Sequence, residues 1–455
     1  MLLSILGFLM VATFMTLIMT RRVAPLVALI VVPVLFGALA GQAPELGEMM
    51  LAGVTKIAPT AAMIMFAILY FGLMIDAGLF DPVVRRLLAV VHGDPVRVVV
   101  GTVILATFVS LDGDGSTTYM VACTALLPLY RRLGLNPLIM ACLIILCSGI
   151  MNLTPWGGPT ARAAAALQLE PADLFLPMIP AMALALAWLV LLAWLYGRAE
   201  RRRLGRLELP APPIPRAVPG AWNDQIAGIS DLTLTEGGQV TVSTDPAACR
   251  PRLLWANAAL TALLLGVLVA SVMPLSVLFM LGFAVAALVN YPRMEELKAR
   301  IASHAPNVLA MVSLVFAAGV FTGILSGTGM VEAMPKSLLA LIPPSMGPYL
   351  APITAALSLP GTFFVSNDAF YFGVLPVLAE AASHYGIGKP AIGAAALVGQ
   401  PFHLLSPLVP STWLLVSLSG VEFGDHQRFT MRWATATCVV LALGAMLLGV
   451  FPLRA

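Results

Sequence analysis

Long apolar runs alternate with short polar stretches along the whole of this 455-residue chain. An α-helix needs about 20 apolar residues to cross the hydrocarbon core of a bilayer, and most of the runs have that length. The pattern predicts simple spans at residues 2–20, 23–41, 59–78, 174–196, 253–272, 274–291 and 306–326. We therefore predict an all-α polytopic membrane protein.

Two further apolar segments, residues 98–130 and 349–380, are each interrupted by a polar tip. The first tip carries Asp112 and Asp114 beside two glycines, and the second reads Ser366-Asn367-Asp368. A carboxylate in hydrocarbon is costly, and irregular backbone at membrane depth is tolerated only where it lines a cavity inside the protein. We therefore expect two re-entrant hairpins whose tips contribute to a binding site.

Prolines interrupt two other apolar segments. Residues 137–167 contain Thr154-Pro155-Trp156-Gly157-Gly158-Pro159-Thr160, and residues 391–420 contain Ser406-Pro407-Leu408-Val409-Pro410-Ser411. Too few residues flank each interruption to make two spans, which favours a broken helix that unwinds beside a cavity. An ordinary proline kink, or a loop between spans, is the alternative.

Composition indicates the same class of protein. Hydrophobic residues make up 60% of the chain and charged residues 10%, with a mean hydropathy of +0.96, whereas soluble domains are about one quarter charged. The net charge of +3 comes from arginines and lysines gathered in a few loops, a pattern typical of cytoplasmic loops that gives no indication of nucleic acid. The five cysteines have no ligand spacing, so we expect neither disulfides nor a metal cluster.

The positive residues also predict an orientation in the cell inner (plasma) membrane. Arg21, Arg85, Arg131 and the arginines between 198 and 206 lie on one side if the first hairpin enters and leaves by the cytoplasmic face. The N-terminus is then outside, and residues 2–20 lack the features of a cleaved signal peptide. Residues 197–252 change to arginine, proline and polar residues, which predicts a cytoplasmic linker with a small hairpin at Glu236-Gly237-Gly238.

The two segments flanking the linker, residues 1–196 and 253–455, share a pattern. Gly72, Gly78 and Asp81 align with Gly323, Gly329 and Glu332, since 323 − 72, 329 − 78 and 332 − 81 all equal 251. The charge pattern places the start of the first half outside and the start of the second half inside, so the repeat is inverted and the second hairpin enters from the external face. Residues 45–57 and 293–304 occupy equivalent places, where we predict interfacial arm helices.

The interrupted segments resemble a known family. The motifs are Leu-Asp-Gly-Asp-Gly-Ser-Thr-Thr at 111–118, Asn-Leu-Thr-Pro-Trp-Gly-Gly-Pro-Thr at 152–160 and Ser-Asn-Asp-Ala-Phe-Tyr-Phe-Gly-Val-Leu-Pro at 366–376. They are similar to motifs of the citrate-metal/proton symporter family of the ion transporter superfamily. The similarity covers the whole chain apart from the linker. The resemblance implies proton-coupled uptake of citrate as its complex with a divalent cation, by an elevator-type movement in a homodimer.

The chemistry of the tips agrees with this resemblance. A bare tricarboxylate would be repelled by Asp112, Asp114 and Asp368, whereas hard cations such as magnesium and calcium prefer oxygen ligands. These three residues are therefore our candidate metal or proton sites. We expect the divalent cation to be transported with the substrate, and we expect no permanently bound cofactor. Citrate carboxylates need donors instead, so the substrate-binding candidates are Ser116, Thr117, Asn152, Thr154, Gly157, Gly158, Thr160, Arg162, Ser366, Asn367, His403, Ser411 and Thr412.

Several of these residues have a second interpretation. Asp112 and Asp114 imitate the start of an EF-hand loop, but the required glycine and closing glutamate are missing. Asp112 also suits a helix N-cap, which is compatible with binding. Arg162 could snorkel to the interface, and His403 could be a packed polar residue.

Other functional classes fit less well. No His-Glu-x-x-His, Gly-x-Ser-x-Gly or phosphate-loop pattern occurs, which argues against an enzyme or an ATP-driven pump. Opposed hairpins fit alternating access better than the continuous pore of a channel. A sodium-coupled di- or tricarboxylate carrier and a cation/proton antiporter stay open as alternatives. Other families of the superfamily that the chain resembles have Ser-Asn-Thr at both tips, whereas this chain has Asp-Gly-Asp-Gly-Ser-Thr at one and Ser-Asn-Asp at the other.

Overall fold

The computed structural model describes residues 2–20, 22–79, 82, 86, 94–113, 115–204, 248–330, 333–334, 345–364 and 366–455. Every regular element in these ranges is a helix, and six of the helices are long and apolar enough to cross a membrane. The chain is therefore a multi-pass helical membrane protein. The predicted hairpin at Glu236-Gly237-Gly238 and the carboxylate of Asp114 lie outside the described residues.

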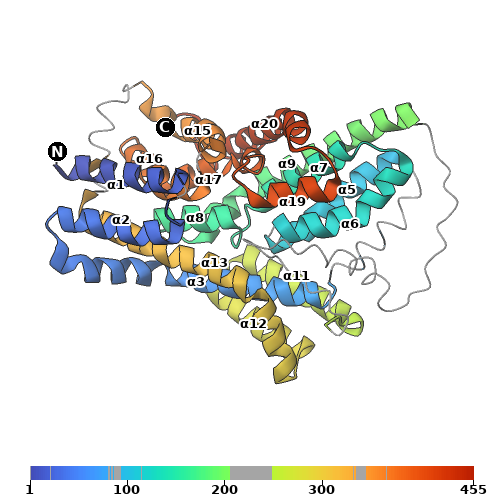
Figure 1. Cartoon of the computed structure of the whole chain (residues 1–455), viewed down its shortest axis with the longest axis horizontal. Helices are drawn as coiled ribbons and strands as arrows, with labels where there is room; N and C mark the ends of the chain where they lie inside the picture. Colours follow the sequence, from blue (N-terminus) through green and yellow to red (C-terminus); the bar gives the residue numbers. More distant parts are fainter. Residues whose placement is uncertain are drawn as a thin grey trace.

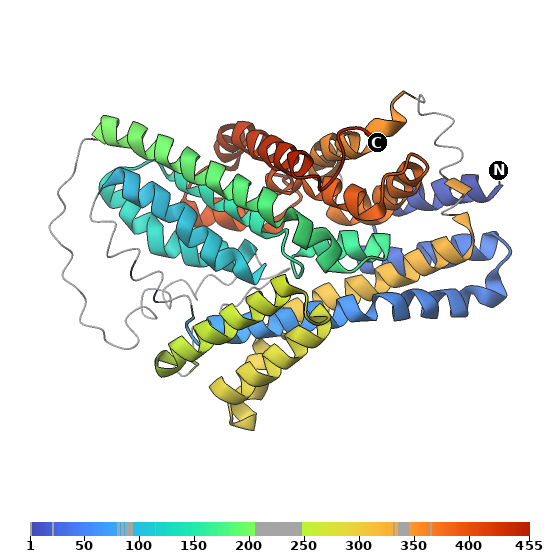
Figure 2. The ribbon, with the colours of Figure 1, turned by 180° about the vertical axis from the view of Figure 1, so that it is seen from behind.

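One group of helices, which we call the long-helix body, forms around two very long helices. Its members are α1 (Leu2–Met19), α2 (Pro25–Leu39), α3 (Leu46–Asp76), α11 (Leu254–Ala270), α12 (Leu275–Asn290) and α13 (Met294–Gly327). These helices share one hydrophobic core that includes Phe14, Tyr70, Phe71, Phe279 and Phe321. In Figures 1 and 2, α3 and α13 lie side by side along the molecule.

The α3 and α13 helices run antiparallel and approach each other through glycines. A Cβ on Gly53 would lie 2.0 Å from the carbonyl oxygen of Gly319, so the two backbones are in direct contact there. Toward the other end of the pair, Gly72 makes room for the His304 ring. Gly78 and Gly329, which follow the two helices, both adopt the left-handed conformation, with φ of 84° and 72°.

The remaining helices form a second group, the hairpin body. Its members are α5 (Pro95–Val109), α6 (Gly115–Leu133), α7 (Pro137–Met151), α8 (Gly158–Leu167), α9 (Pro171–Leu204), α15 (Leu350–Phe364), α16 (Leu375–Ser383), α17 (Lys389–Leu397), α18 (Gln400–His403), α19 (Pro410–Ser419) and α20 (Phe423–Leu447). A separate hydrophobic core joins them, with Tyr119, Tyr130 and Tyr371 buried in it. The two groups also pack against each other, because the core of the long-helix body takes in Trp156, Ala161 and Phe372.

Two hairpins in this body point toward each other. The α5–α6 hairpin approaches from the end of the molecule at which α9 ends, and the α15–α16 hairpin approaches from the end that holds both chain termini (Figures 1 and 2). The first tip contains a 3-10 turn, Ser110–Asp112, and Gly113 in the left-handed conformation at φ 77°. After the second tip the chain continues as a π-helix, Ala369–Val374, before α16 begins.

Two sequence predictions need correction. Residues 45–57 and 293–304 are not separate arm helices, because α3 runs unbroken from Leu46 to Asp76 and α13 from Met294 to Gly327. Pro59 and Pro306, where the predicted spans 59–78 and 306–326 begin, lie inside these continuous helices. In addition, α9 continues through Leu204, past the predicted start of the linker at residue 197.

Candidate functional site

A cavity of about 400 Å³ lies where the two bodies meet. One wall comes from the end of α3 and from α13, and the other comes from both hairpin tips and both helix breaks. Cavities that hold small ligands commonly have volumes of about 300–1,000 Å³. This cavity is therefore large enough for a small organic anion with a bound cation.

The cavity brings together half of the residues that the sequence singled out. Those that line it are Asp112, Thr117, Asn152, Gly158, Arg162, Asn367, His403 and Ser411. The predicted residues in the described part of the chain that do not line it are Ser116, Thr154, Gly157, Thr160, Ser366, Asp368 and Thr412. Asp114 lies outside the described residues, so its placement stays a prediction.

The first hairpin tip is held against the first helix break. The indole Nε1 of Trp156 donates a hydrogen bond of 2.9 Å to the carbonyl oxygen of Leu111. The Trp156 ring also lies directly against Gly113, where a Cβ would come within 2.8 Å of it. This contact sets the position of the buried Asp112 carboxyl at the cavity wall.

The backbone of the first break is closely folded. A Cβ on Gly157 would lie 2.0 Å from the carbonyl oxygen of Asn152, so only glycine fits there. The hydroxyl of Thr160 donates to the carbonyl oxygen of Leu153 at 3.0 Å and closes the turn. Helix α8 begins at Gly158, on the cavity wall, and so directs its unpaired N–H groups and positive dipole end toward the cavity.

The second hairpin tip is joined to the first break by an ion pair. The Nε atom of Arg162 on α8 lies 2.5 Å from Oδ1 of Asp368, and both side chains are largely buried. The neighbouring Asn367 faces Gln400, whose Nε2 donates to Oδ1 of Asn367 at 3.2 Å and to the Tyr371 hydroxyl at 2.7 Å. Gln400 lines the cavity and was not among the predicted residues.

The predicted residues at the second break have two different environments. His403 is buried at the cavity, and its Nδ1 lies 2.6 Å from the carbonyl oxygen of Thr362, which orients the ring. Ser411, in the first turn of α19, also lines the cavity. Thr412 instead donates to the carbonyl oxygen of Leu404 and stabilises the break from behind.

The opposite wall carries charged residues that the sequence analysis did not select. Asp76 is the last residue of α3, and its Oδ2 lies 3.0 Å from Nε2 of His304 and 3.7 Å from a guanidinium nitrogen of Arg300, both on α13. We call these three residues the wall cluster. Asp76 and His304 line the cavity directly, across from the hairpin tips. The signal that could have identified them is a charged residue inside an apolar span, which usually has a function.

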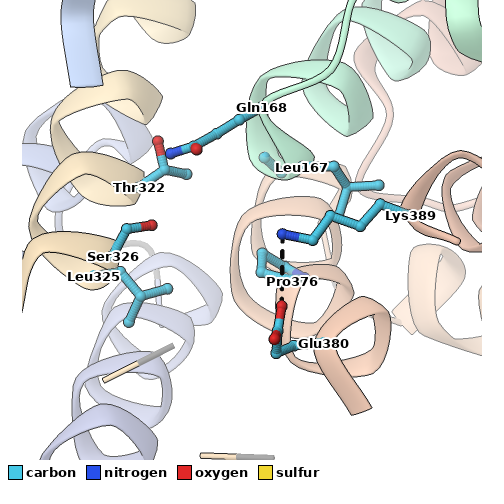
Figure 3. Close-up of a pocket in the computed structure, with 9 residues that line it drawn as sticks. Leu167, Gln168, Thr322, Leu325, Ser326, Pro376, Glu380 and Lys389 are labelled. Carbon is cyan, nitrogen blue, oxygen red and sulfur yellow. Dashed lines mark ion pairs between the residues drawn. The ribbon is translucent and has the colours of Figure 1, made fainter. Parts of the chain in front are cut away.

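A second pocket between the two bodies is much smaller. It encloses about 40 Å³, room for a water molecule but not for an organic acid. Figure 3 shows Thr322 and Ser326 of α13 on one side and the ion pair of Glu380 with Lys389, 3.5 Å apart, on the other. We therefore take the larger cavity as the candidate site.

Sequence comparison identifies a family and close relatives. The family model described as "Citrate transporter" (CitMHS) matches residues 14–399. A citrate transporter of Bacillus subtilis (strain 168) is 52% identical over 98% of this chain and 99% of its own length. A Mg(2+)/citrate complex secondary transporter of the same organism is 48% identical over 98% of both chains.

Solved structures show a similar fold at low sequence identity. The YdaH transporter of Alcanivorax borkumensis superimposes with a TM-score of 0.57 and 15% identity, over 91% of this chain and 90% of its own. MtrF of Neisseria gonorrhoeae also gives a TM-score of 0.57, with 14% identity over 91% and 86% of the two chains. At this identity the similarity concerns the fold alone.

Proposed function

Because this chain belongs to the CitMHS family of citrate transporters, and is a transporter and not an enzyme, we propose that it carries citrate as a complex with a divalent cation. The transport is a symport with protons into the cell. The relative that is named a Mg(2+)/citrate complex secondary transporter supports this substrate. The observation that carries the proposal is the cavity at which both hairpin tips meet, because its charges suit a metal complex better than bare citrate.

The charge balance of the cavity supports a metal-bound substrate. Among the described residues, the carboxylates of Asp76, Asp112 and Asp368 outnumber the guanidinium groups of Arg162 and Arg300 at or beside its wall. Citrate with all carboxyls ionised has a charge of about −3, and a divalent cation reduces that to about −1. The complex therefore enters an acidic cavity with much less repulsion than the free anion.

The proposed ligands follow from the chemistry of each side of the complex. Magnesium and calcium bind oxygen, so the Asp112 carboxylate, together with Asp114, completes a coordination shell that citrate itself partly fills. The free citrate carboxylates face donors at the breaks, which are Asn152, the N-terminus of α8 and Ser411. Asp368 positions the Arg162 guanidinium at the cavity. Protonation of Asp112, Asp114 or Asp368 couples transport to protons.

We also propose that the two halves, residues 1–196 and 253–455, form an inverted repeat with the linker on the cytoplasmic side and the N-terminus outside. The antiparallel contact of α3 with α13 supports this. At one end Met49 contacts Gly327, and at the other end Asp76 contacts Arg300. The offset of 251 residues between the halves makes Gly327 the counterpart of Asp76 and Arg300 the counterpart of Met49, so the two contacts are related by a two-fold axis. The hairpins, entering from opposite faces, then meet near mid-membrane.

In this proposal the hairpin body moves as an elevator against the long-helix body, within a homodimer in the plasma membrane. Most residues of each hydrophobic core come from one body, which supports such a division. The core of the long-helix body also includes Trp156, Ala161 and Phe372 of the hairpin body, so these apolar contacts would have to re-form in each cycle. The few polar contacts across the boundary, such as Lys56 Nζ with Gln168 Oε1 at 2.5 Å, would break and re-form in each cycle.

Uptake by proteoliposomes tests the proposal. Labelled citrate should accumulate when magnesium and an inward proton gradient are both present, and removal of the metal by a chelator or of the gradient by a protonophore should stop it. Uptake that requires sodium, or that proceeds equally well without a divalent cation, would support a sodium-coupled carboxylate carrier instead. Metal export without citrate would support a cation/proton antiporter.

A further inference from the structure

The wall cluster places a histidine on the body opposite the hairpin tips. Its Asp76 side chain is only 2% exposed, whereas His304 is 18% exposed and lies at the cavity surface. The imidazole Nε2 is 3.0 Å from the Asp76 carboxylate, and Gly72 leaves the space that the ring occupies. The ring is therefore fixed by a carboxylate behind it and faces the space where a substrate would lie.

Helix packing does not require this cluster. The two-fold relation of α3 and α13 gives Asp76, Arg300 and His304 the counterparts Gly327, Met49 and Gly53, since 304 − 53 also equals 251. At that other end the contact is apolar and close, with the Met49 side chain against Gly327 and Gly53 against the Gly319 backbone. The same antiparallel contact is thus made without charge, so the charged residues at the cavity end need another explanation.

The charge of the cluster depends on one residue. The charges of Asp76 and Arg300 cancel, so the cluster gains one positive charge when His304 takes up a proton. Histidine is the side chain whose charge normally changes between about pH 5 and 8. Among the described residues, the other titratable or charged groups near the cluster or across the cavity are Tyr291, Arg250 with its partner Glu296, Asp112, Arg162 with its partner Asp368, and His403.

We propose that His304, held by Asp76, is a proton-binding site whose positive form strengthens the binding of the anionic citrate–metal complex. This inference rests on the proposed function and adds a proton site on the long-helix body to the carboxylates of the tips. Protonation of His304 places a cation opposite an anion, and by thermodynamic linkage the bound complex strengthens proton binding at His304 by the same factor. The added affinity is present at low pH and is lost as the pH rises through the range in which His304 loses its proton.

Calorimetric titration of the purified full-length chain with magnesium citrate tests this inference. The His304→Gln variant keeps a hydrogen-bonding side chain beside Asp76 but never becomes charged. Since the citrate complex titrates identically in both samples, the informative quantity is the ratio of wild-type to variant affinity. We expect this ratio to fall roughly fivefold or more between about pH 5.5 and 8. A ratio that does not change with pH overturns the inference.

Two further variants complete the experiment. Asn307 lies one turn away on the same cavity wall and does not titrate, so the ratio of wild-type to Asn307→Ala affinity should not vary with pH, whatever its value. Asp76→Asn keeps the histidine but removes the carboxylate that holds its ring at the cavity, so the pH dependence of the affinity should differ from that of the wild type. A pH dependence identical to that of the wild type overturns the inference even if His304→Gln does not fold. Absence of any magnesium citrate binding by the wild type would instead overturn the proposed function as well.

Discussion

Arg162 on α8 and Asp368 at the second hairpin tip form an ion pair with an N–O distance of 2.5 Å across 206 residues of sequence. The pair joins a helix break in the first half of the chain to a hairpin tip in the second half. Because the Trp156 indole joins the same break to the first tip, three of the four polar interruptions are connected side by side at one cavity. A substitution at any one of them should therefore alter the positions of the others.

Asp368→Asn should abolish most metal-dependent citrate uptake while the protein stays folded. The substitution leaves the Arg162 guanidinium without its carboxylate, and hydrogen bonds between charged groups contribute about 1.5–3 kcal/mol, so we expect uptake to fall roughly tenfold or more. Asp425→Asn, which makes the same chemical change at an exposed position, should leave uptake near the wild-type level. Normal uptake by the Asp368 variant would remove this residue from the site.

Asp112→Asn and Asp114→Asn should weaken metal-dependent transport in a different way. An amide keeps an oxygen ligand but loses the charge that attracts a divalent cation, so the magnesium concentration needed for half-maximal citrate uptake should rise. Titration of uptake against magnesium at fixed citrate measures this, with the exposed Asp173→Asn as the matched control. If the magnesium requirement of Asp112→Asn equals that of the wild type, Asp112 serves only to cap the hairpin helix.

Gly157→Ala should damage transport through the backbone alone. The added methyl group would lie 2.0 Å from the Asn152 carbonyl oxygen, and relief requires the break to unfold locally, at about 1–3 kcal/mol. Gly266→Ala in α11 adds the same methyl group where no atom lies within 4 Å, so its uptake should match the wild type and its melting temperature should be equal or slightly higher. Full activity of Gly157→Ala would show that the break does not hold this conformation.

Gly53→Ala should destabilise the long-helix body. Its methyl group would lie 2.0 Å from the Gly319 carbonyl oxygen and 2.8 Å from the Gly323 Cα. Since both of these are backbone atoms of α13, the two helices must separate. We expect a loss of about 1–3 kcal/mol in unfolding free energy, seen as a lower melting temperature. Gly47→Ala in the same helix, with nothing within 4 Å of its Cβ, is the control and should melt at the wild-type temperature or slightly above it, because alanine favours the helix.

The helix interruptions could be predicted from sequence because the residues that cause them are close together in the chain. Asp112 beside two glycines, and the Thr154–Thr160 stretch with two prolines, conflict with their apolar surroundings, and the chain does leave the α-helix at these points. The predicted boundaries before residues 59 and 306 were wrong, because the helices continue through Pro59 and Pro306, and a proline looks the same in sequence whether a helix begins there or continues.

The wall cluster and Gln400 could not be assigned from sequence in the same way. Asp76 and His304 are 228 residues apart, and no motif links them; only the contact between α3 and α13 brings them together. Gln400 is polar but belongs to no recognised motif, and its partners Asn367 and Tyr371 come from the hairpin. Besides the presence of a charge in an apolar span, a position-by-position comparison of the two halves marks the cluster, because His304 and Asp76 replace glycines.

The direct backbone contact at Gly53 has a consequence for energy conservation. Where two helices touch with no side chain between them, no chain of water molecules fits, so hydronium and small ions cannot leak along that seam. The glycines of α3 and α13 therefore seal the long-helix body at one end of the pair, whereas the charged residues of the wall cluster lie at the other end.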